Sequence, residues 1–374
     1  MIIKTDLLKE KCSAILNAVD SNELSIVTET LQLKANNTTL SMSVTNREYF
    51  VEIKLNLDQP ENFHATVNAN LFLKLISQIT TASIELDVNG NSLVVKGNGT
   101  YKLPLICDND KLLELPEIII NNVTSEQSIH SDILNSILNY NTKELTRGTI
   151  SKPVQKLYYI DNNGAITFTS GACVNSFNLS QPIRILLNQR IVKLFKLFQN
   201  VDVKMSLGFD SLSDEIIQTK VKFETKDVVL TAVISCDDTL LNSVPVNAIR
   251  NRSDKTYDNS IVVNKDAMLQ TINRLLLFSS GIGSREIIKP YSMFEFNQNE
   301  VKVWDVNKQN SETIAYANNT AINETYTATL DLVDLKSVLE NRIDEYITLN
   351  FGDHQAFVLV KNNIKFVIPE IKLV

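Results

Sequence analysis

The feature that most constrains the fold of this 374-residue chain is a threefold internal repeat. Three amphipathic helix windows begin near Leu7, Ile133 and Met268, with starts 126 and 135 residues apart. Each window opens with a Thr, Ser or Asn and an Asp, whose oxygens accept hydrogen bonds from the free N–H groups of a first helical turn. Because self-similarity at a near-constant spacing indicates a repeated structural unit, we expect three copies of one domain.

A second helix window recurs inside each copy, at residues 68–76, 188–195 and 331–339. Each window carries a lysine among closely spaced apolar residues. One such window would match by chance, but runs of short alternating strands follow all three, the first with an Asn-Gly turn at Asn89. The predicted order in each copy is strand, helix, strands, helix, strands. Helices and strands do not alternate singly, so the sequence predicts an α+β fold with two helices against antiparallel sheet per copy.

The predicted domains are residues 1–122, 123–250 and 251–374. The second junction contains a polar stretch at residues 247–255, which we interpret as an exposed linker.

The composition excludes several classes of protein. There are 36 Lys and Arg against 43 Asp and Glu, a net charge of −7, which excludes a uniformly basic nucleic-acid binder but not a locally basic surface. Four scattered cysteines without a C-x-x-C pair, and three separated histidines, predict free thiols and no zinc site. There is neither a signal-peptide pattern nor an apolar run of ~18 residues. We therefore expect a cytoplasmic protein without membrane association, metal or cofactor.

Several local motifs accompany the repeat. Copy one ends with Tyr101-Lys-Leu-Pro-Leu followed by Glu114-Leu-Pro-Glu-Ile, copy two contains Thr167-Phe-Thr-Ser-Gly, and the chain closes with Phe366-Val-Ile-Pro-Glu-Ile-Lys-Leu. In this order and spacing, the whole chain resembles the bacterial DNA polymerase III beta-subunit sliding clamp. Two departures favour a divergent member with altered partner preference, from a phage or mobile element for example. Residues 170–173 (Ser-Gly-Ala-Cys) replace an Asp-Gly-His-Arg-like stretch, and Glu370 replaces an apolar residue.

The resemblance implies a non-enzymatic processivity factor for DNA replication. Two protomers would close head to tail into a ring of six similar domains, with helices lining the hole and sheets outside, loaded by a clamp loader and binding a DNA polymerase. Taken with their flanking turns, the six helix windows together carry eleven Lys and Arg against seven Asp and Glu, a net of +4, which leaves −11 for the remaining chain; these windows are residues 6–18, 68–79, 130–143, 188–200, 264–278 and 331–342. A basic lining attracts phosphates, and phosphate contacts carry no sequence information.

The resemblance also suggests site residues, each with an ordinary structural alternative: a solvated helix face for the cations and internal core for the apolar residues. The predicted DNA contacts are Lys74, Lys143, Arg147, Arg190, Lys193, Lys196, Arg274 and Lys336. The predicted dimer contacts are Leu103 and Leu105 against Leu277 and Phe278 of the partner. The predicted walls of a partner-peptide cleft are Val154, Thr169, Gly171, Val174, Leu241, Val244, Phe366, Ile368 and Pro369, with Ala356 as a further candidate.

Two other functions remain open from the sequence. A thiol hydrolase could use Cys173 beside Gly171 with His130 or His354 as base, but no oxyanion-type glycine cluster accompanies them, so we expect Cys173 to be buried and inert. A structural or scaffold protein would share the repeat without needing a basic lining.

Overall fold

The computed structural model describes residues 1–374 except 20–24, 147–149, 212–216, 235–236, 279–289, 306, 318–321, 341–343 and 373–374. Its residues form two compact units. Unit one is Met1–Asn135 with Ser180–Cys236, and unit two is Ser136–Leu179 with Asp237–Val374. The middle third of the chain thus contributes to both units, and the division into three domains stays a prediction.

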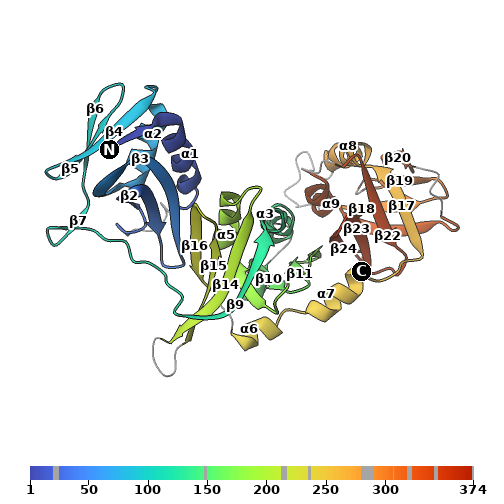
Figure 1. Ribbon diagram of the computed structural model, residues 1–374. Coiled ribbons are helices and arrows are strands. Elements are labelled where there is room, and N and C mark those ends of the chain that lie inside the picture. The colour runs from blue at the N-terminus through green and yellow to red at the C-terminus, as the bar shows by residue number, and fades with distance from the viewer. Residues whose placement is uncertain are drawn as a thin grey trace. The chain divides into compact units, whose positions relative to one another are not determined.

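The first part of unit one combines helices α1 and α2 with antiparallel sheets (Figure 1). A four-stranded sheet has the order β1-β4-β5-β6, and the long strands β2 and β3 form an antiparallel pair. Helices α1 and α2 lie against each other and against β3. The elements are β1 (Ile2–Lys4), α1 (Thr5–Leu16), β2 (Thr30–Thr45), β3 (Tyr49–Asn68), α2 (Ala69–Gln78), β4 (Ser83–Asn89), β5 (Ser92–Lys96), β6 (Thr100–Pro104) and the short pair β7 (Cys107–Asp108) and β8 (Lys111–Leu112).

The second part of unit one extends the β2–β3 pair into a larger sheet. Strand β16 pairs with β3, with Val228 opposite Ile53 and Ala232 opposite Tyr49. The resulting six-stranded sheet has the order β2-β3-β16-β15-β14-β9. The elements of this second part of unit one are β9 (Asn122–His130), β13 (Arg184–Asn188), α5 (Gln189–Lys193) with a 3₁₀ turn (Leu194–Leu197), β14 (Asp202–Ser211), β15 (Ile217–Glu224) and β16 (Val228–Val233).

Unit two is built in the same way around two sheets. One runs in the order β20-β19-β18-β21, and the other contains the strands β10-β11-β12-β24-β23-β22-β17 in that order. Helix α3 (Ser131–Ser136) ends where unit one passes into unit two. The helical elements of unit two are a π turn (Ile137–Asn141), α4 (Thr142–Thr146), a 3₁₀ turn (Pro153–Lys156), α6 (Asp238–Asn242), α7 (Val246–Ser253), α8 (Lys265–Leu276) and α9 (Leu332–Leu339). Its strands are β10 (Leu157–Asp161), β11 (Gly164–Phe168), β12 (Ala172–Ser176), β17 (Asn259–Asn264), β18 (Tyr291–Phe296), β19 (Glu300–Trp304), β20 (Ser311–Ala315), β21 (Tyr326–Asp331), β22 (Tyr346–Phe351), β23 (Ala356–Lys361) and β24 (Ile364–Pro369).

Side-chain caps explain where four of the repeated helices begin, whereas α1 follows Lys4, whose side chain makes no capping hydrogen bond, so the cap expected from Thr5 and Asp6 is not formed. The side chains of Asn68, Asn188 and Asn264 accept hydrogen bonds of 2.9–3.0 Å from the backbone N–H three residues ahead. Asp331 does the same at the start of α9, accepting from the N–H groups of Val333 and Asp334. Such caps satisfy donors that a first helical turn leaves unpaired. The element order confirms the predicted α+β class, with strand, helix, strands, helix and strands in each third of the chain.

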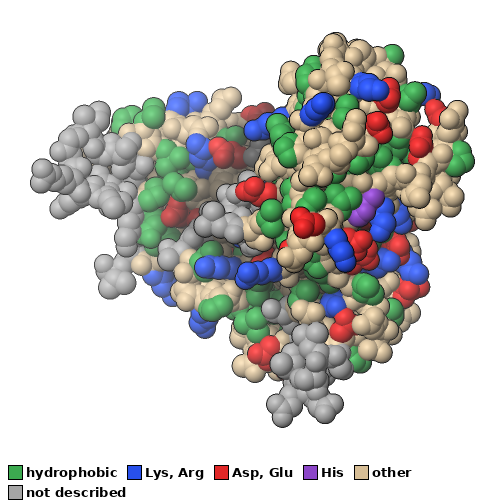
Figure 2. Space-filling model, turned by 90° about the vertical axis from the view of Figure 1, so that its left-hand side faces the viewer, with side chains coloured by type: hydrophobic (Ala, Val, Ile, Leu, Met, Phe, Trp, Pro, Cys, Tyr) green, Lys and Arg blue, Asp and Glu red, His purple; other side chains and the backbone are tan. Residues whose placement is uncertain are grey.

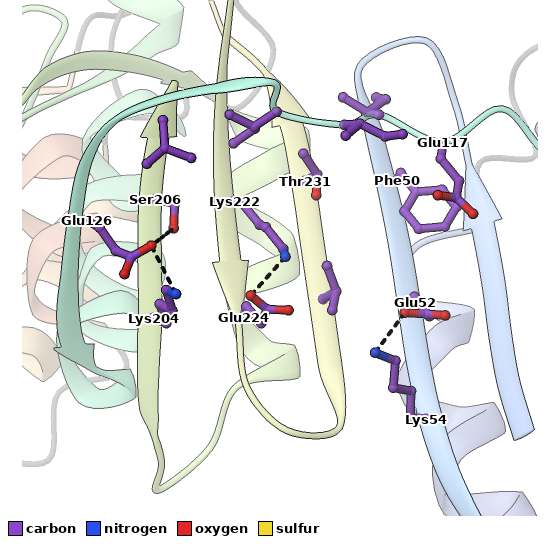
Figure 3. Close-up of a pocket in the computed structure, with 15 residues that line it drawn as sticks. Phe50, Glu52, Lys54, Glu117, Glu126, Lys204, Ser206, Lys222, Glu224 and Thr231 are labelled. Carbon is purple, nitrogen blue, oxygen red and sulfur yellow. Dashed lines mark hydrogen bonds and ion pairs between the residues drawn. The ribbon is translucent and has the colours of Figure 1, made fainter. Parts of the chain in front are cut away.

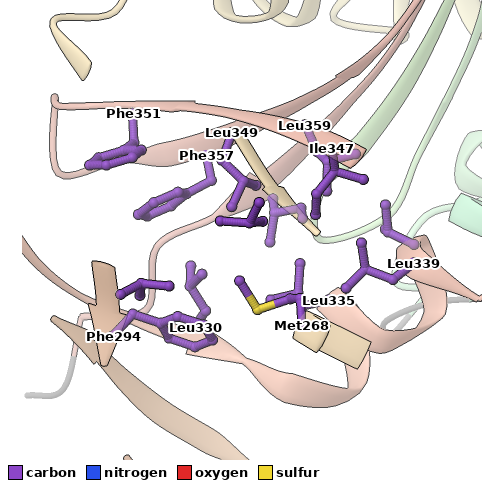
Figure 4. Close-up of a cluster of buried hydrophobic side chains, with 14 of the residues drawn as sticks. Met268, Phe294, Leu330, Leu335, Leu339, Ile347, Leu349, Phe351, Phe357 and Leu359 are labelled. Carbon is purple, nitrogen blue, oxygen red and sulfur yellow. The ribbon is translucent and has the colours of Figure 1, made fainter. Parts of the chain in front are cut away.

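Apolar burial holds these helices on their sheets. In unit two, Met268 of α8 and Leu335 and Leu339 of α9 point toward Leu349 and Phe357 of the sheet (Figure 4). An aromatic cluster continues this core, with the ring centroids of Phe296 and Phe351 4.4 Å apart and those of Phe351 and Phe357 5.0 Å apart. Burying a side chain of this size stabilises the fold by about 1.5–3 kcal/mol. None of the helices described here is long and apolar enough to cross a membrane.

Candidate functional site

Unit two contains an apolar groove of about 380 Å³. Its walls come from the turn between β11 and β12, from Pro245 and helix α7, and from strands β23 and β24. A cluster formed by Ala172, Ala356, Val358 and Val367, with Phe168 and Ile249 packed against it, underlies these walls. The lining residues are Phe168, Thr169, Ser170, Gly171, Ala172, Pro245, Ala248, Ile249, Arg252, Gln355, Ala356, Val367 and Pro369.

The structure brings part of the predicted cleft together in this groove. Thr169, Gly171, Pro369 and the further candidate Ala356 line it. Four other predicted residues are buried and are not among the lining residues: Val154, Val174, Leu241 and Val244.

Two predicted cleft residues on β24 need a correction. Phe366 and Ile368 are 0% and 1% exposed and belong to the main core of unit two. Successive side chains of a strand point to opposite faces of its sheet. The groove side of β24 therefore carries Val367 and Pro369.

Buried hydrogen bonds hold the Thr169 wall of the groove in place. The Thr169 hydroxyl donates to the Glu144 carboxyl at 2.6 Å, and the Thr169 N–H donates to the same oxygen at 3.1 Å. The side-chain amide of Gln155 donates to the Thr169 carbonyl at 3.0 Å. Gln155 is itself oriented by the N–H groups of Ser151 and Lys152, each 2.8 Å from its side-chain oxygen. The wall is therefore positioned before any ligand arrives.

Helix α7 is a part of the groove that the sequence did not predict. Residues 247–255 looked like an exposed linker, but residues 247–253 are helical, and α7 packs on β12 and β24. Arg250 anchors the helix through two hydrogen bonds to Asp161, of 2.9 and 2.7 Å. This pairing raises the pKa of Arg250. The apolar residues of α7 are Val246, Ala248 and Ile249, all in its first half, which is too short a pattern to reveal an amphipathic helix.

The unusual Glu370 next to Pro369 has partners on the far side of its strand. Its carboxyl accepts a 3.0 Å hydrogen bond from the Tyr326 hydroxyl and lies 3.5 Å from His354 Nδ1. The His354 ring stacks on Tyr326, with centroids 4.5 Å apart. Glu370 is absent from the groove lining, so its charge does not oppose an apolar ligand there.

The predicted DNA contacts differ in how far their charges are neutralised. Lys74, Lys193 and Lys196 are exposed, and no carboxylate in the described part of the chain lies within 4 Å of their amines. Arg190 lies 3.9 Å from Glu48, Lys336 lies 3.6 Å from Glu340, and Lys143 donates to the Glu340 carbonyl at 2.8 Å. Arg274 pairs with Glu312, donating from Nε at 2.7 Å, and this raises the pKa of Arg274. Arg147 lies outside the described residues.

Three lysines on the six-stranded sheet of unit one are paired with glutamates. Lys54, Lys204 and Lys222 lie 3.3, 2.9 and 2.8 Å from Glu52, Glu126 and Glu224 (Figure 3). On the face of the molecule shown in Figure 2, basic and acidic side chains are likewise interspersed. Because a paired charge projects a weaker field than an unpaired one, these three lysines contribute less positive potential than Lys74, Lys193 and Lys196.

The predicted dimer contacts are mostly accessible. Leu277 and Phe278, which follow α8, are 69% and 47% exposed, and Leu105 is half-buried. Leu103 is buried at 3% exposure. Among the described strands, β6, which carries Leu103, lies at the edge of its sheet. An edge strand offers backbone N–H and C=O groups to a further strand. The role of Leu103, Leu105, Leu277 and Phe278 in a dimer stays a prediction.

Cys173 is fully buried, as expected for an inert thiol. Within the described residues, no group of three or more His, Cys, Asp or Glu side chains could hold a metal ion.

Comparisons with known proteins agree with this architecture. Residues 1–111 match the family described as DNA polymerase III beta subunit, N-terminal domain. The whole chain superimposes on the DNA polymerase III subunit beta of Pseudomonas aeruginosa with a TM-score of 0.78 at 12% identity, covering 100% of both chains. The sliding clamp of Bacillus subtilis gives 0.76 at 14% identity and the beta subunit of Thermotoga maritima gives 0.75 at 13%, each covering 100% of this chain and 99% of theirs. By sequence, no curated protein matches.

The fold is thus that of the sliding clamps over the full length of the chain. Together with the family match of residues 1–111, it supports a divergent DNA polymerase III beta-type clamp, the family that the sequence resembles. The suggested phage or mobile-element source stays a prediction.

Proposed function

We propose that this protein is a DNA sliding clamp, of which two copies close into a ring around duplex DNA and tether a replicative DNA polymerase. The observation that carries the proposal is the full-length likeness to solved clamps, in which the superposition covers 100% of this chain and 100% of the Pseudomonas aeruginosa subunit. The role is non-catalytic: the ring holds a polymerase on its template, and ATP use belongs to a clamp loader.

Retention in this proposal comes from topology and not from affinity. Exposed lysines such as Lys74, Lys193 and Lys196 contact phosphates weakly and without regard to base sequence. Weak contacts permit sliding, while a closed ring prevents escape. Closure would use the exposed apolar pair Leu277 and Phe278 of one protomer and the open edge strand β6 of the other. Two such head-to-tail contacts would leave neither edge exposed.

The groove in unit two is the proposed attachment point for the polymerase and the clamp loader. Its apolar lining suits a short peptide with large aliphatic or aromatic side chains, since a few buried anchors carry most of the affinity of such contacts. The preformed Thr169 wall lowers the ordering cost of binding.

Retention on DNA of different topology tests the proposal. A clamp loader loads the protein onto nicked circular duplex DNA. Gel filtration removes the unbound protein, and the protein–DNA complex is divided into two samples. One half is linearised with a restriction enzyme. We expect the protein to stay with the circle and to run off the linear DNA. A scaffold protein that does not encircle DNA would be lost equally from both forms, and that outcome would overturn the proposal.

A further inference from the structure

The segment that connects the two parts of unit one is fastened to the sheet that both parts share. Residues 113–121 form neither helix nor strand, yet Leu115 is only 5% exposed. Residues 117–121, which we call the strap, lead into β9 after crossing the face of the six-stranded sheet, and Glu117 lies beside Phe50 of β3 (Figure 3). Strands β14, β15 and β16 separate β9 from β3. The strap therefore crosses the seam at which β3, from the first third of the chain, pairs with β16, from the middle third.

A buried ion pair holds the strap on the sheet. Lys220 of β15 pairs with Asp210 of β14, and their side chains are only 7% and 10% exposed. The Lys220 amine also donates to the Ile119 carbonyl at 2.6 Å, and the Asp210 carboxylate accepts from the Asn121 N–H at 2.8 Å. The Lys220 amine, together with the Asn121 N–H, holds the pKa of Asp210 below its ordinary value, so the carboxyl stays charged. Each member of this pair, which we call the latch, thus binds one backbone group of the strap.

The chain approaches the sheet most closely beside the latch. Gly208 of β14 lies under the strap, and an added Cβ there would overlap with the Asn122 carbonyl oxygen and with the Ile120 side chain. The Asn122 side chain also donates to the Phe209 carbonyl at 3.3 Å. A glycine in a strand interior permits such an approach of a second backbone. The strap can therefore lie in this place only while position 208 has no side chain.

The seam under the strap is short. Strands β3 and β16 pair over five positions. Beyond these, the Lys54 N–H donates to the Asp227 carbonyl and the Val233 N–H donates to the Glu48 carbonyl, each at 2.8 Å. Short elements open locally from their ends. A segment that is fastened on one side of the seam and lies against β3 on the other side would oppose this opening.

We propose that the latch of Lys220 and Asp210 fixes the strap across the seam, and that releasing the latch loosens the pairing of β3 with β16. A buried ion pair suits this role because removing either member leaves the other charge buried without its partner. Opening of the proposed ring has to bend its protomers, so a latch at this seam would set part of their stiffness. That consequence rests on the proposed function, whereas the latch itself does not.

Hydrogen–deuterium exchange at single amides of the full-length protein tests this inference without DNA. The Asn121 N–H reports on the strap, because its acceptor is the latch carboxylate. The Lys54 and Val233 N–H groups report on the seam. Amides of β5, which belongs to the other sheet of this part of the chain, serve as the internal reference.

Two single variants disturb the strap by different routes. Lys220→Met removes the latch cation, and Gly208→Ala displaces the strap while keeping both latch charges. The matched control is Lys222→Met, which removes a lysine of the same strand whose amine pairs with Glu224 at 2.8 Å.

We expect the Asn121 amide to exchange at least about tenfold faster in Lys220→Met and in Gly208→Ala than in the wild type, because a buried hydrogen bond is lost or displaced. The Lys54 and Val233 amides should become faster in the same two variants, and the β5 amides should not. Lys222→Met should change all of these rates by less than about twofold.

A double variant separates the latch from overall stability. Lys220→Met with Asp210→Leu removes both buried charges, which should return the midpoint of urea unfolding toward the wild-type value. The Ile119 carbonyl and the Asn121 N–H still lack their partners in this protein. We therefore expect the strap and seam amides to exchange as fast as in Lys220→Met.

Three results would overturn the inference. The first is an Asn121 amide that exchanges in the wild type as fast as an unstructured amide. The second is an equal acceleration of strap, seam and β5 amides in Lys220→Met, which would assign the effect to global unfolding. The third is a faster strap with an unchanged seam. The wild-type and Gly208→Ala measurements keep the inference testable even if Lys220→Met fails to fold, and the retention test on DNA decides the proposed function separately.

Discussion

The hydrogen bonds under the groove give the sharpest test of how its wall is held. Thr169 is 9% exposed and Glu144 is fully buried, and the 2.6 Å hydrogen bond between them is out of reach of solvent. Thr169→Val keeps the shape of the side chain and removes the hydroxyl donor. A buried acceptor that loses its donor costs about 1–3 kcal/mol. Because the Thr169 N–H still donates to the same oxygen, we expect a loss of about 1–2 kcal/mol in the free energy of unfolding.

The single tryptophan, Trp304, lies in the same unit and reports on its unfolding. Urea titrations followed by its fluorescence give the unfolding free energies of the wild type, Thr169→Val and the control Thr327→Val. Thr327 is an exposed strand residue, so its substitution should change stability by less than about 0.5 kcal/mol. If Thr169→Val behaves like Thr327→Val, the Glu144 hydrogen bond does not stabilise the groove wall and the reasoning fails.

Two further predictions concern charge. Replacing Lys193 and Lys196 together by Glu should weaken binding to duplex DNA and lower the slope of log Kd against log salt by about two. The exposed control pair Lys156→Glu and Lys308→Glu should leave that slope unchanged. Equal slopes for both double variants would remove Lys193 and Lys196 from the DNA-facing set. Burial raises the pKa of Tyr158 to about 12, although its hydrogen bond to Thr142 acts in the opposite direction. The folded state therefore holds the Tyr158 proton more tightly than the unfolded state does. The resulting contribution to the free energy of unfolding is complete below about pH 10 and is lost as the pH rises toward 12. The free energy of unfolding should therefore fall between pH 9.5 and 11.5 less steeply in Tyr158→Phe than in the wild type, and identical slopes would contradict this assignment.

The architecture was predictable because its signals are local. Capping residues such as Asn68, Asn188 and Asp331 stand immediately before amphipathic windows, and the same order of elements recurs three times. Helix bounds were less predictable. The window at residues 130–143 contains a π turn at Ile137–Asn141, and the window at 188–200 ends as a 3₁₀ turn, because tertiary packing and not propensity decides the last turns.

The groove was predictable only in part, because its lining depends on pairings between distant segments. Thr169, Gly171 and Pro369 follow from the resemblance, but the face of β24 that meets the groove is decided by its pairing with β12 and β23. A shift of one residue along a strand exchanges its faces, so Val367 replaces the expected Phe366 and Ile368. Arg252 was hidden in a polar stretch, and its acceptors Asp353 and Gln355 lie far away in sequence.

Low-resolution particle images of the purified full-length protein test the central claim most directly. The account predicts a hollow annulus made of two protomers, wide enough to admit a DNA duplex. A particle without a central hole, at a concentration where the protein is dimeric by light scattering, would contradict it.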